Sequence, residues 1–486
     1  MYDLYKPLRN YLRKHELFSG FSAVYHYFQF LQFDVSPPKE LRHPELSLRG
    51  AYAVGLFEWE LLTLTREILL NCVEGQGRSL FSWKAIAAAS NKIKHIENET
   101  WGRLAKEDDI MFEMARIANR TFHWQLGINQ PTITRYFRIT NHSLIRPMII
   151  DEFGMTPREM FQIGVALSGH FLSKPVLTLP ITNSLNSVSS ERCAAFLSRF
   201  SRTLAEHKML AQSAQTYDIN WAYNFSSLEE FPLVQMNERR VFCPIPTLLL
   251  RRLCDGLYFD LVRRGNEFHP TFGVAYEDYV GDVLVAANFA GTFQILKAEQ
   301  YGPRTARKDT IDWILFDDSA ALFIECKASR VRLQAKVDLL KREAVLAELR
   351  KLAGFIAQAY ATLNDALNNQ YNSWKPAGTP IYPLIVTLDS WQRFGYLDVI
   401  LEHVKAVFEE RGLNTNLLVQ HPYTLCAVDE FEQAIQIMAA VGINQFMSGK
   451  VTGEQAHWEL GTYVKRFFEA EEIEHTKGLF GMEFAG

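Results

Sequence analysis

The sequence predicts a C-terminal α/β core, in which helices flank a mixed sheet, preceded by a mainly α-helical N-terminal domain. Apolar residues recur at helical spacing through most of the first part of the chain. Two apolar, strand-like runs then flank a polar turn at 317–319. Beyond that turn, strand-like and helix-like segments alternate, which is typical of a sheet covered by helices on both sides. The predicted domains are 1–265 and 266–445, followed by a helical extension over 446–486.

Length and composition limit the class of protein. A chain of 486 residues exceeds one ordinary core, and 48% apolar with 22% charged residues is typical of a globular protein. No apolar run reaches the roughly 18 residues that span a bilayer, and the N-terminus lacks the apolar segment of a signal peptide. Six scattered cysteines form no CxxC pair, so we expect a cytoplasmic protein without a zinc knuckle or a disulfide framework. Because the net charge is −4, any contact with nucleic acid needs a local basic patch.

In the N-terminal domain, helix signals dominate. Thr156 and Glu159 form a capping-box pattern with Pro157 at the first helical position, which opens a helix over 157–172. The polar stretch 264–270 marks the domain boundary. The further predicted segments are helices over 48–72, 191–212 and 247–264, a polar loop over 182–190 and a small hairpin over 231–244.

The C-terminal domain begins with an amphipathic helix over 272–284, which carries Glu277. A strand over 292–297 follows, and then a hairpin whose strands cover 311–316 and 321–324. The remaining predicted segments are one long helix or two joined helices over 331–369, a strand over 380–388, a helix over 397–411, a strand over 423–428 and a helix over 429–441.

The most informative residues are Asp312, Glu325 and Lys327, at the end of this hairpin. Side chains alternate along a strand, so Glu325 and Lys327 share one face while Cys326 points to the other. Asp312 can lean over the first face from the partner strand. Two carboxylates and one ammonium group indicate a divalent-metal hydrolase site, because Mg²⁺ and Mn²⁺ prefer oxygen ligands. The alternative is an edge hairpin with a solvated salt bridge.

The order of these elements resembles the PD-(D/E)xK nuclease superfamily, whose core contains a helix with a glutamate, a strand, an aspartate, a hairpin, a Glu-x-Lys and a further helix. The resemblance covers roughly residues 268–430, and Ile311 stands where the name of the family has proline. It implies a restriction-endonuclease-like core that hydrolyses phosphodiester bonds with Mg²⁺ or Mn²⁺.

The resemblance also implies roles for individual residues. Asp312, Glu325 and the backbone carbonyl of Cys326 would bind the metal. Lys327 would orient or deprotonate the attacking water, or offset charge on the scissile phosphate. Glu277 would bind a second metal or position the first.

Basic residues surround the hairpin. Between Lys327 and Lys351 there are eight basic and three acidic residues, and three more basic residues precede the hairpin. The alternative for each of them is a solvated charged face, and for Gln358, on the long helix, a surface amide. The residues that we expect to contact nucleic acid are Arg304, Arg307, Lys308, Arg330, Arg332, Lys336 and Gln358.

We therefore expect a Mg²⁺-dependent endonuclease that acts on DNA. The alternatives are the same fold acting on RNA or tRNA, and a binding or scaffold protein with an inactive nuclease fold. A large helical region ahead of a nuclease is similar to the architecture of bacterial phage-defence effectors, and it predicts a phage protein as a trigger. Two further pairs, Arg116 with His123 and Arg135 with His142, loosely match the spacing of HEPN ribonucleases, but their aromatic neighbours indicate packing.

Overall fold

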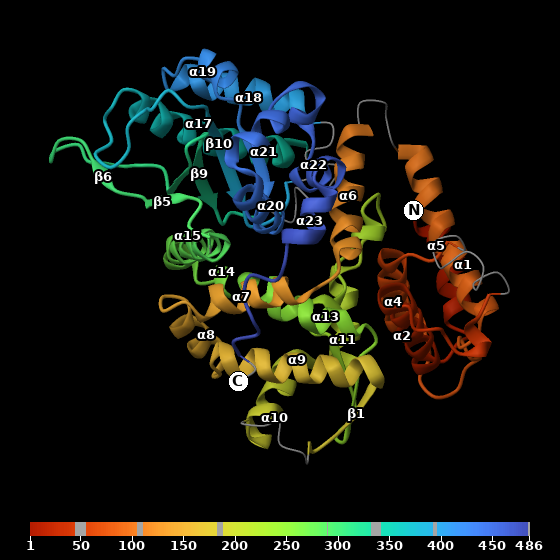
Figure 1. The fold of residues 1–486 in the computed structure, drawn as a ribbon. Coiled ribbons are helices and arrows are strands. Elements are labelled where there is room, and N and C mark those ends of the chain that lie inside the picture. The colour runs from red at the N-terminus through yellow and green to blue at the C-terminus, as the bar shows by residue number, and fades with distance from the viewer. Residues whose placement is uncertain are drawn as a thin grey trace.

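The computed structural model describes residues 1–43, 55–104, 110–181, 188–288, 290–331, 342–391 and 396–484. It combines helices with small mixed sheets, and its N-terminal region is helical, as the sequence predicts. Figure 1 shows the first helices at one side of the molecule and the largest sheet with its covering helices at the other. No helix within these ranges is both long and apolar enough to cross a bilayer.

The first helices enclose their own apolar cluster. Leu8, Phe21, Leu64 and Ile93, one from each of four helices, are fully buried in it. These helices are α1 (Tyr2–Leu12), α2 (Leu17–Phe33), α4 (Glu58–Asn71) and α5 (Trp83–Leu104). The helix predicted over 48–72 therefore begins at Glu58, and the part of it up to residue 54 lies outside the described residues.

The next helices lie beside the largest sheet and beneath it in Figure 1. The predicted capping box is confirmed, since the Thr156 hydroxyl accepts from the Glu159 amide and the Glu159 carboxylate accepts from the Thr156 amide. It opens α9 at Pro157 because a cap satisfies amides that have no partner within the helix. These helices are α6 (Ile110–Leu126), α7 (Gln130–Asn141), α8 (Arg146–Phe153), α9 (Pro157–Ser173), α10 (Ser190–Phe200) and α11 (Leu204–Ala214).

One helix prediction in this region is wrong in detail. The single helix over 191–212 is interrupted by the strand β2 (Ser201–Thr203), after which Thr203 and Glu206 form a new capping box that starts α11. The helix predicted over 247–264 is confirmed as a continuous helical stretch, in which a π-helical turn, η4 (Arg252–Gly256), joins α13 (Pro246–Arg251) and α14 (Leu257–Val262). The predicted polar loop lies outside the described residues over 182–187.

The predicted hairpin over 231–244 is confirmed as β3 (Leu233–Asn237) and β4 (Arg240–Phe242), which pair antiparallel. It belongs to a four-stranded sheet of order β1-β4-β3-β2, in which β1 covers Val176–Thr178. The sequence analysis missed β1 and β2 because each has only three residues, which is too short for a periodic signal.

The largest sheet has five strands in the order β11-β10-β9-β8-β5. The strands β9, β10 and β11 are parallel, whereas β8 and β5 run antiparallel to their neighbours. This arrangement confirms the predicted mixed sheet. The strands are β5 (Gln294–Lys297), β8 (Trp313–Phe316), β9 (Ala321–Lys327), β10 (Ile381–Thr387) and β11 (Thr424–Ala427), with a separate two-stranded hairpin of β6 (Gln300–Tyr301) and β7 (Lys308–Asp309).

Helices cover both faces of this sheet (Figure 1). Phe323 and Ile385 face α17 and α18, whereas Ile324 and Val386 face α15 and α20. The predicted long helix is described from residue 342, and 332–341 lie outside the described residues. The covering helices are α15 (Phe268–Ala287), α17 (Arg342–Leu367), α18 (Leu397–Glu410) and α20 (Val428–Val441), and the short helices α19 (Asn416–Gln420), α21 (Ile443–Lys450), α22 (Leu460–Phe467) and α23 (Glu469–His475) complete this part of the chain.

Apolar packing continues across the predicted domain boundary at residue 265. Leu261 and Phe268, on either side of the boundary, belong to one buried cluster that also contains Ile324 of the large sheet. The C-terminal segment returns to the N-terminal region, where the Phe484 ring contacts Phe137 and Phe161. The helices before residue 265 are therefore packed directly against the layer that covers the sheet.

Candidate active site

The β8–β9 hairpin opens at its end farthest from the turn. The backbone ladder between the two strands ends at the pair Trp313 and Ile324. Beyond it, Asp312 Oδ2 accepts a hydrogen bond from the Cys326 amide at 2.7 Å, so a side chain takes the place of the next backbone acceptor. This bond fixes the Asp312 carboxylate beside Glu325, as the sequence predicts.

Glu325 and Lys327 share the sheet face that α17 covers. Lys327 Nζ donates to Glu325 Oε1 at 2.5 Å and to Gln358 Oε1 of α17 at 3.2 Å. The Glu325 side chain is 1% exposed and that of Lys327 is 17% exposed, so the predicted salt bridge is buried rather than solvated. The Cys326 side chain packs on the opposite face, as strand alternation requires. The structure thus brings Gln358 to Lys327.

Glu277 reaches this end of the sheet from α15, on the opposite face. The Trp313 indole nitrogen donates to the Glu277 carbonyl at 3.1 Å, which ties the helix to the strand that follows Asp312. Gly281 allows the close approach, because a Cβ there would lie 2.2 Å from the Trp313 ring. Within the described residues, the Glu277 carboxylate makes no hydrogen bond or ion pair.

The pKa values of all three carboxyl groups are raised, with burial as the largest cause. Burial and the Asp312 carboxylate raise the pKa of Glu325 to about 7, and the same two causes raise the pKa of Glu277 to about 7. Burial also raises the pKa of Asp312, against the opposing effects of the Cys326 amide and of Lys327. Burial alone would lower the pKa of Lys327, but the Glu325 and Asp312 carboxylates outweigh it and the pKa is raised. The site therefore holds more negative charge than its one buried ammonium group offsets.

The donor set was tested for its fit to a metal ion. Across the described parts of the chain, no three His, Cys, Asp or Glu side chains form a ready-made metal cluster. Mg²⁺, however, keeps several waters and needs only one or two carboxylates. Asp312 and Glu325 supply hard oxygen donors whose negative charge is not fully offset. The Cys326 carbonyl lies on β9 between Glu325 and Lys327. These groups fit Mg²⁺ or Mn²⁺, and the buried thiol of Cys326, whose pKa burial raises strongly, does not favour a thiolate metal site.

A lysine that the sequence analysis missed also lies here. Lys297, the last residue of β5, donates to Asp278 Oδ1 at 2.7 Å, and its charge partly offsets the raised pKa of Glu277. Lys297 could have been identified from its place at the end of the first predicted strand. That strand, β5, pairs with β8, and Lys297 is the partner of Trp313, the residue after Asp312.

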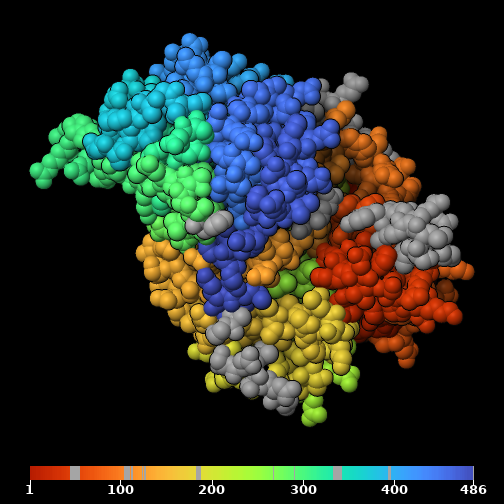
Figure 2. All heavy atoms as spheres, viewed as in Figure 1, coloured from red at the N-terminus to blue at the C-terminus, as the bar shows by residue number. Residues whose placement is uncertain are grey.

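The predicted basic residues before the hairpin lie on a projecting arm. Arg304, Arg307 and Lys308 are exposed, and they belong to the β6–β7 hairpin, which extends away from the body of the molecule in Figures 1 and 2. Lys308 pairs with Asp365 at 2.7 Å and Arg307 donates to Gln300. The arm therefore presents positive charge on a hairpin whose base, at Ala298, is hydrogen-bonded to the Asp312 carbonyl.

The prediction that Arg330 contacts nucleic acid is wrong. Its side chain is 4% exposed, and it donates to the Tyr136 hydroxyl and to Asp255. A buried guanidinium with protein partners cannot serve as a phosphate contact. The two remaining predicted contacts, Arg332 and Lys336, lie outside the described residues.

The second Arg/His pair has separate contacts, since Arg135 pairs with Glu432 and His142 contacts Asp278. This agrees with the packing interpretation. In the first pair, Arg116 pairs with Glu113, and the His123 side chain lies outside the described part of the structure.

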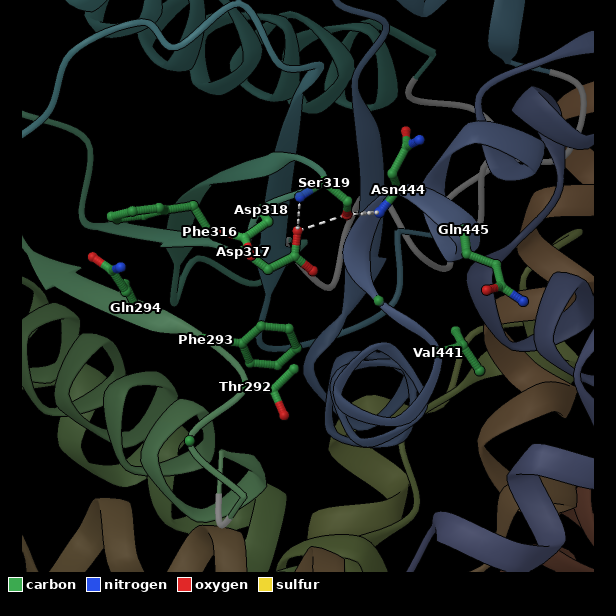
Figure 3. Close-up of a pocket in the computed structure, with 12 residues that line it drawn as sticks. Thr292, Phe293, Gln294, Phe316, Asp317, Asp318, Ser319, Val441, Asn444 and Gln445 are labelled. Carbon is green, nitrogen blue, oxygen red and sulfur yellow. Dashed lines mark hydrogen bonds between the residues drawn. The ribbon is translucent and has the colours of Figure 1, made fainter.

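A polar hollow of about 610 Å³ lies at the turn end of the same hairpin (Figure 3). Asp317 accepts from the amides of Ser319, Ala320 and Ile443, and so caps the start of α21. Burial alone would raise the pKa of Asp317, but these hydrogen bonds lower it below its ordinary value. Asp317 and Ser319 in its lining already have hydrogen-bond partners, and the hollow does not contain the catalytic candidates.

Comparison with protein-family models found no match, and comparisons with curated proteins and with solved structures found none either. The function has to be inferred from the geometry of the site.

Proposed function

We propose that this protein is a metal-dependent nuclease that hydrolyses phosphodiester bonds, with DNA as its substrate. The observation that carries the proposal is the open end of the β8–β9 hairpin. There, the half-buried Asp312 and the buried Glu325 lie beside Lys327, and burial raises the pKa of both carboxyl groups, with the Asp312 charge adding to the rise at Glu325. Perturbed ionisable groups that converge at one strand end indicate a functional site.

The residues of the site would have different roles in the reaction. Asp312, Glu325 and the Cys326 carbonyl would hold the divalent ion, with Glu277 beside them. Once bound, such an ion supplies charge neutralisation and an activated water for phosphoryl chemistry. Lys327 has a raised pKa, so its resting state is an ammonium group. That state favours orientation of a water or stabilisation of phosphate charge over the role of a base.

Gln358 and the projecting arm suit the handling of a substrate. Gln358 fixes the Lys327 ammonium from α17, which limits the rotamers available to that long side chain. Arg304 and Arg307 would track the phosphate backbone next to the site. Phosphate contacts do not distinguish DNA from RNA, so the proposed substrate is tested by comparing cleavage of DNA and of RNA.

The test compares the wild type with the double variant Asp312→Ala, Glu325→Ala. Each protein is incubated with plasmid, single-stranded DNA and total RNA in Mg²⁺ or Mn²⁺. We expect the wild type to cut DNA and the double variant to lose cleavage. The matched control is Asp318→Ala, which removes an exposed carboxylate from the turn of the same hairpin and should cut normally. Equal cleavage by the wild type and the double variant would falsify the site, and cleavage confined to RNA would reassign the substrate.

The role in phage defence remains a prediction from the architecture. We propose that the helices before residue 265 receive the trigger, since they pack against the layer that covers the sheet. Cleavage measured with and without lysate from phage-infected cells tests this role. Stimulation by infected lysate alone supports it, and equal activity in both lysates contradicts it.

A further inference from the structure

Helix α7 and the residue after it join the N-terminal region to the candidate nuclease core. Arg135 forms two bonds with the Glu432 carboxylate of α20, at 2.6 and 2.9 Å, and the same carboxylate accepts from the Tyr279 hydroxyl at 2.7 Å. His142 Nε2 lies 3.2 Å from Asp278 Oδ2. Asp278 and Tyr279 are the two residues that follow Glu277 in α15. One twelve-residue helix therefore holds the element that carries Glu277.

The same helix holds the segment that leaves the site after Lys327. Arg330 lies three residues beyond Lys327 and donates to the Tyr136 hydroxyl of α7. It also donates to Asp255, both to its carboxylate at 3.2 Å and to its carbonyl at 3.3 Å. Asp255 belongs to the π-helical turn η4, and such turns often mark functional positions in a helix.

Arg330 also connects the ends of two parallel strands. Its guanidinium lies 3.5 Å from the Asp389 carboxylate, two residues after the end of β10. The Leu388 amide donates to the Lys327 carbonyl at 3.1 Å, and Thr387 Oγ1 donates to the Asp389 carbonyl at 2.8 Å. A shift of Arg330 would therefore reach the backbone of Lys327 through the ion pair with Asp389 and the hydrogen bonds of Thr387 and Leu388.

We infer that α7 positions the candidate catalytic residues from both sides, with Arg330 as the positioning residue for Lys327. This inference rests on the proposed nuclease function and names its regulation. Tyr136 and Asp255 hold the Lys327 side, whereas Arg135 and His142 hold the Glu277 side. A partner that displaces the N-terminal helices would loosen the Lys327 side and the Glu277 side of the site together. The reason is that all four contact residues lie in the region before residue 265.

The experiment changes one hydroxyl. Replacing Arg330 would remove a guanidinium group that is 4% exposed and bonded to both Tyr136 and Asp255, which endangers folding, so the test variant is Tyr136→Phe. The matched control is Tyr258→Phe, because the Tyr258 ring also lies against the Arg330 guanidinium, at 4.8 Å, while its hydroxyl makes no bond to Arg330. Hydrogen exchange is measured for peptides covering β9 through Arg330 and for α2 as an internal reference. The kcat and KM of plasmid cleavage are measured in parallel.

We expect Tyr136→Phe to raise exchange at the end of β9 severalfold, leave α2 unchanged, and lower kcat at least fivefold with KM constant. Tyr258→Phe should stay within twofold of the wild type in every readout. Unchanged exchange at the end of β9, or an equal rise in α2, overturns the inference. If exchange responds locally while the wild type and Glu325→Gln both fail to cleave, the positioning inference stands and the proposed nuclease function fails.

Discussion

The two ends of the β8–β9 hairpin carry the same residue type in opposite electrostatic states. At the turn, Asp317 accepts from three backbone amides and its pKa is lowered. At the open end, about 16 Å away along the strand, Asp312 accepts from one amide and its pKa is raised by burial. The first carboxylate is satisfied by the fold, whereas the second is buried next to two other carboxylates and one lysine.

This difference separates a carboxylate that the fold satisfies from one that we propose binds a metal ion. A carboxylate that caps a helix has its charge offset where it stands, so it needs no ligand. Clustered carboxylates with raised pKa values lower their free energy when a cation arrives, or when they take up protons. Four experiments test this contrast.

The largest effect is expected at the open end, from Lys327→Met. The change keeps the length of the side chain and removes the ammonium group that Glu325 and Gln358 hold. We expect the cleavage rate to fall by about 100- to 10,000-fold, the usual range for a positioned acid–base or charge-stabilising group. The measurement is single-turnover cleavage of plasmid DNA. A rate within twofold of the wild type would remove Lys327 from the mechanism.

The second effect concerns the stability of the same end. The Glu325 carboxyl has an ordinary pKa of 4.5, which the fold raises to about 7. The folded state therefore binds this proton more tightly, so its contribution to stability is complete below about pH 4.5 and is lost as the pH rises through about 7. Glu325→Gln cannot ionise and should gain on the order of 2–3 kcal/mol relative to the wild type across that window.

Denaturant unfolding at pH 4.5 and pH 8, in the presence of a chelator, measures this gain. Adding Mg²⁺ at pH 8 should raise the Tm of the wild type and leave the Tm of Glu325→Gln unchanged, because an ion bound only by the folded state stabilises it. Equal Mg²⁺ responses would mean that Glu325 does not hold the ion.

The third experiment moves to the turn. Asp317→Ala leaves the Ile443, Ser319 and Ala320 amides without their acceptor, which should cost about 1–3 kcal/mol of folding free energy. The cleavage rate per folded molecule should not change. Thermal unfolding and cleavage measured on one preparation separate the two quantities. A loss of kcat without loss of stability would mean that the turn end also takes part in catalysis.

The smallest effect is expected from the arm, where Arg304 and Arg307 are changed to Gln together. Binding to DNA should weaken by a similar factor for every sequence, and the slope of log K against log salt should become shallower by about 0.9 for each lost phosphate contact. Fluorescence anisotropy at several salt concentrations measures the slope. The control is Arg350→Gln, a surface arginine that pairs with Glu410 at 2.6 Å and should leave the slope unchanged.

Much of this site can be predicted from the sequence. Strand alternation places Glu325 and Lys327 on one face and Cys326 on the other, and the structure agrees. The two apolar runs around a polar turn correctly indicate the hairpin, because period-two patterning and turn residues are local properties. The alternation of helix and strand signals also indicates a sheet covered by helices on both sides, and the structure agrees.

Other features depend on tertiary contacts and escape local patterns. Arg330 has the same local signature as an exposed basic residue, and its burial depends on Tyr136 and Asp255 from distant parts of the chain. The split of the helix over 191–212 did have a local signal, the Thr203 and Glu206 capping box, which the apolar periodicity masked. That the chain belongs to the PD-(D/E)xK nuclease superfamily stays a prediction.

The contact of Gly281 with Trp313 limits how this chain can change. The missing methyl group lets helix and strand meet, and the same tryptophan anchors the Glu277 carbonyl. Even alanine at position 281 would force the helix outward or rotate the indole, and either change would move the glutamate relative to the aspartate across the sheet. The distance between Glu277 and Asp312 thus depends on the absence of a side chain at Gly281. The substitution Gly281→Ala therefore measures how large a displacement of the two acids the proposed reaction tolerates.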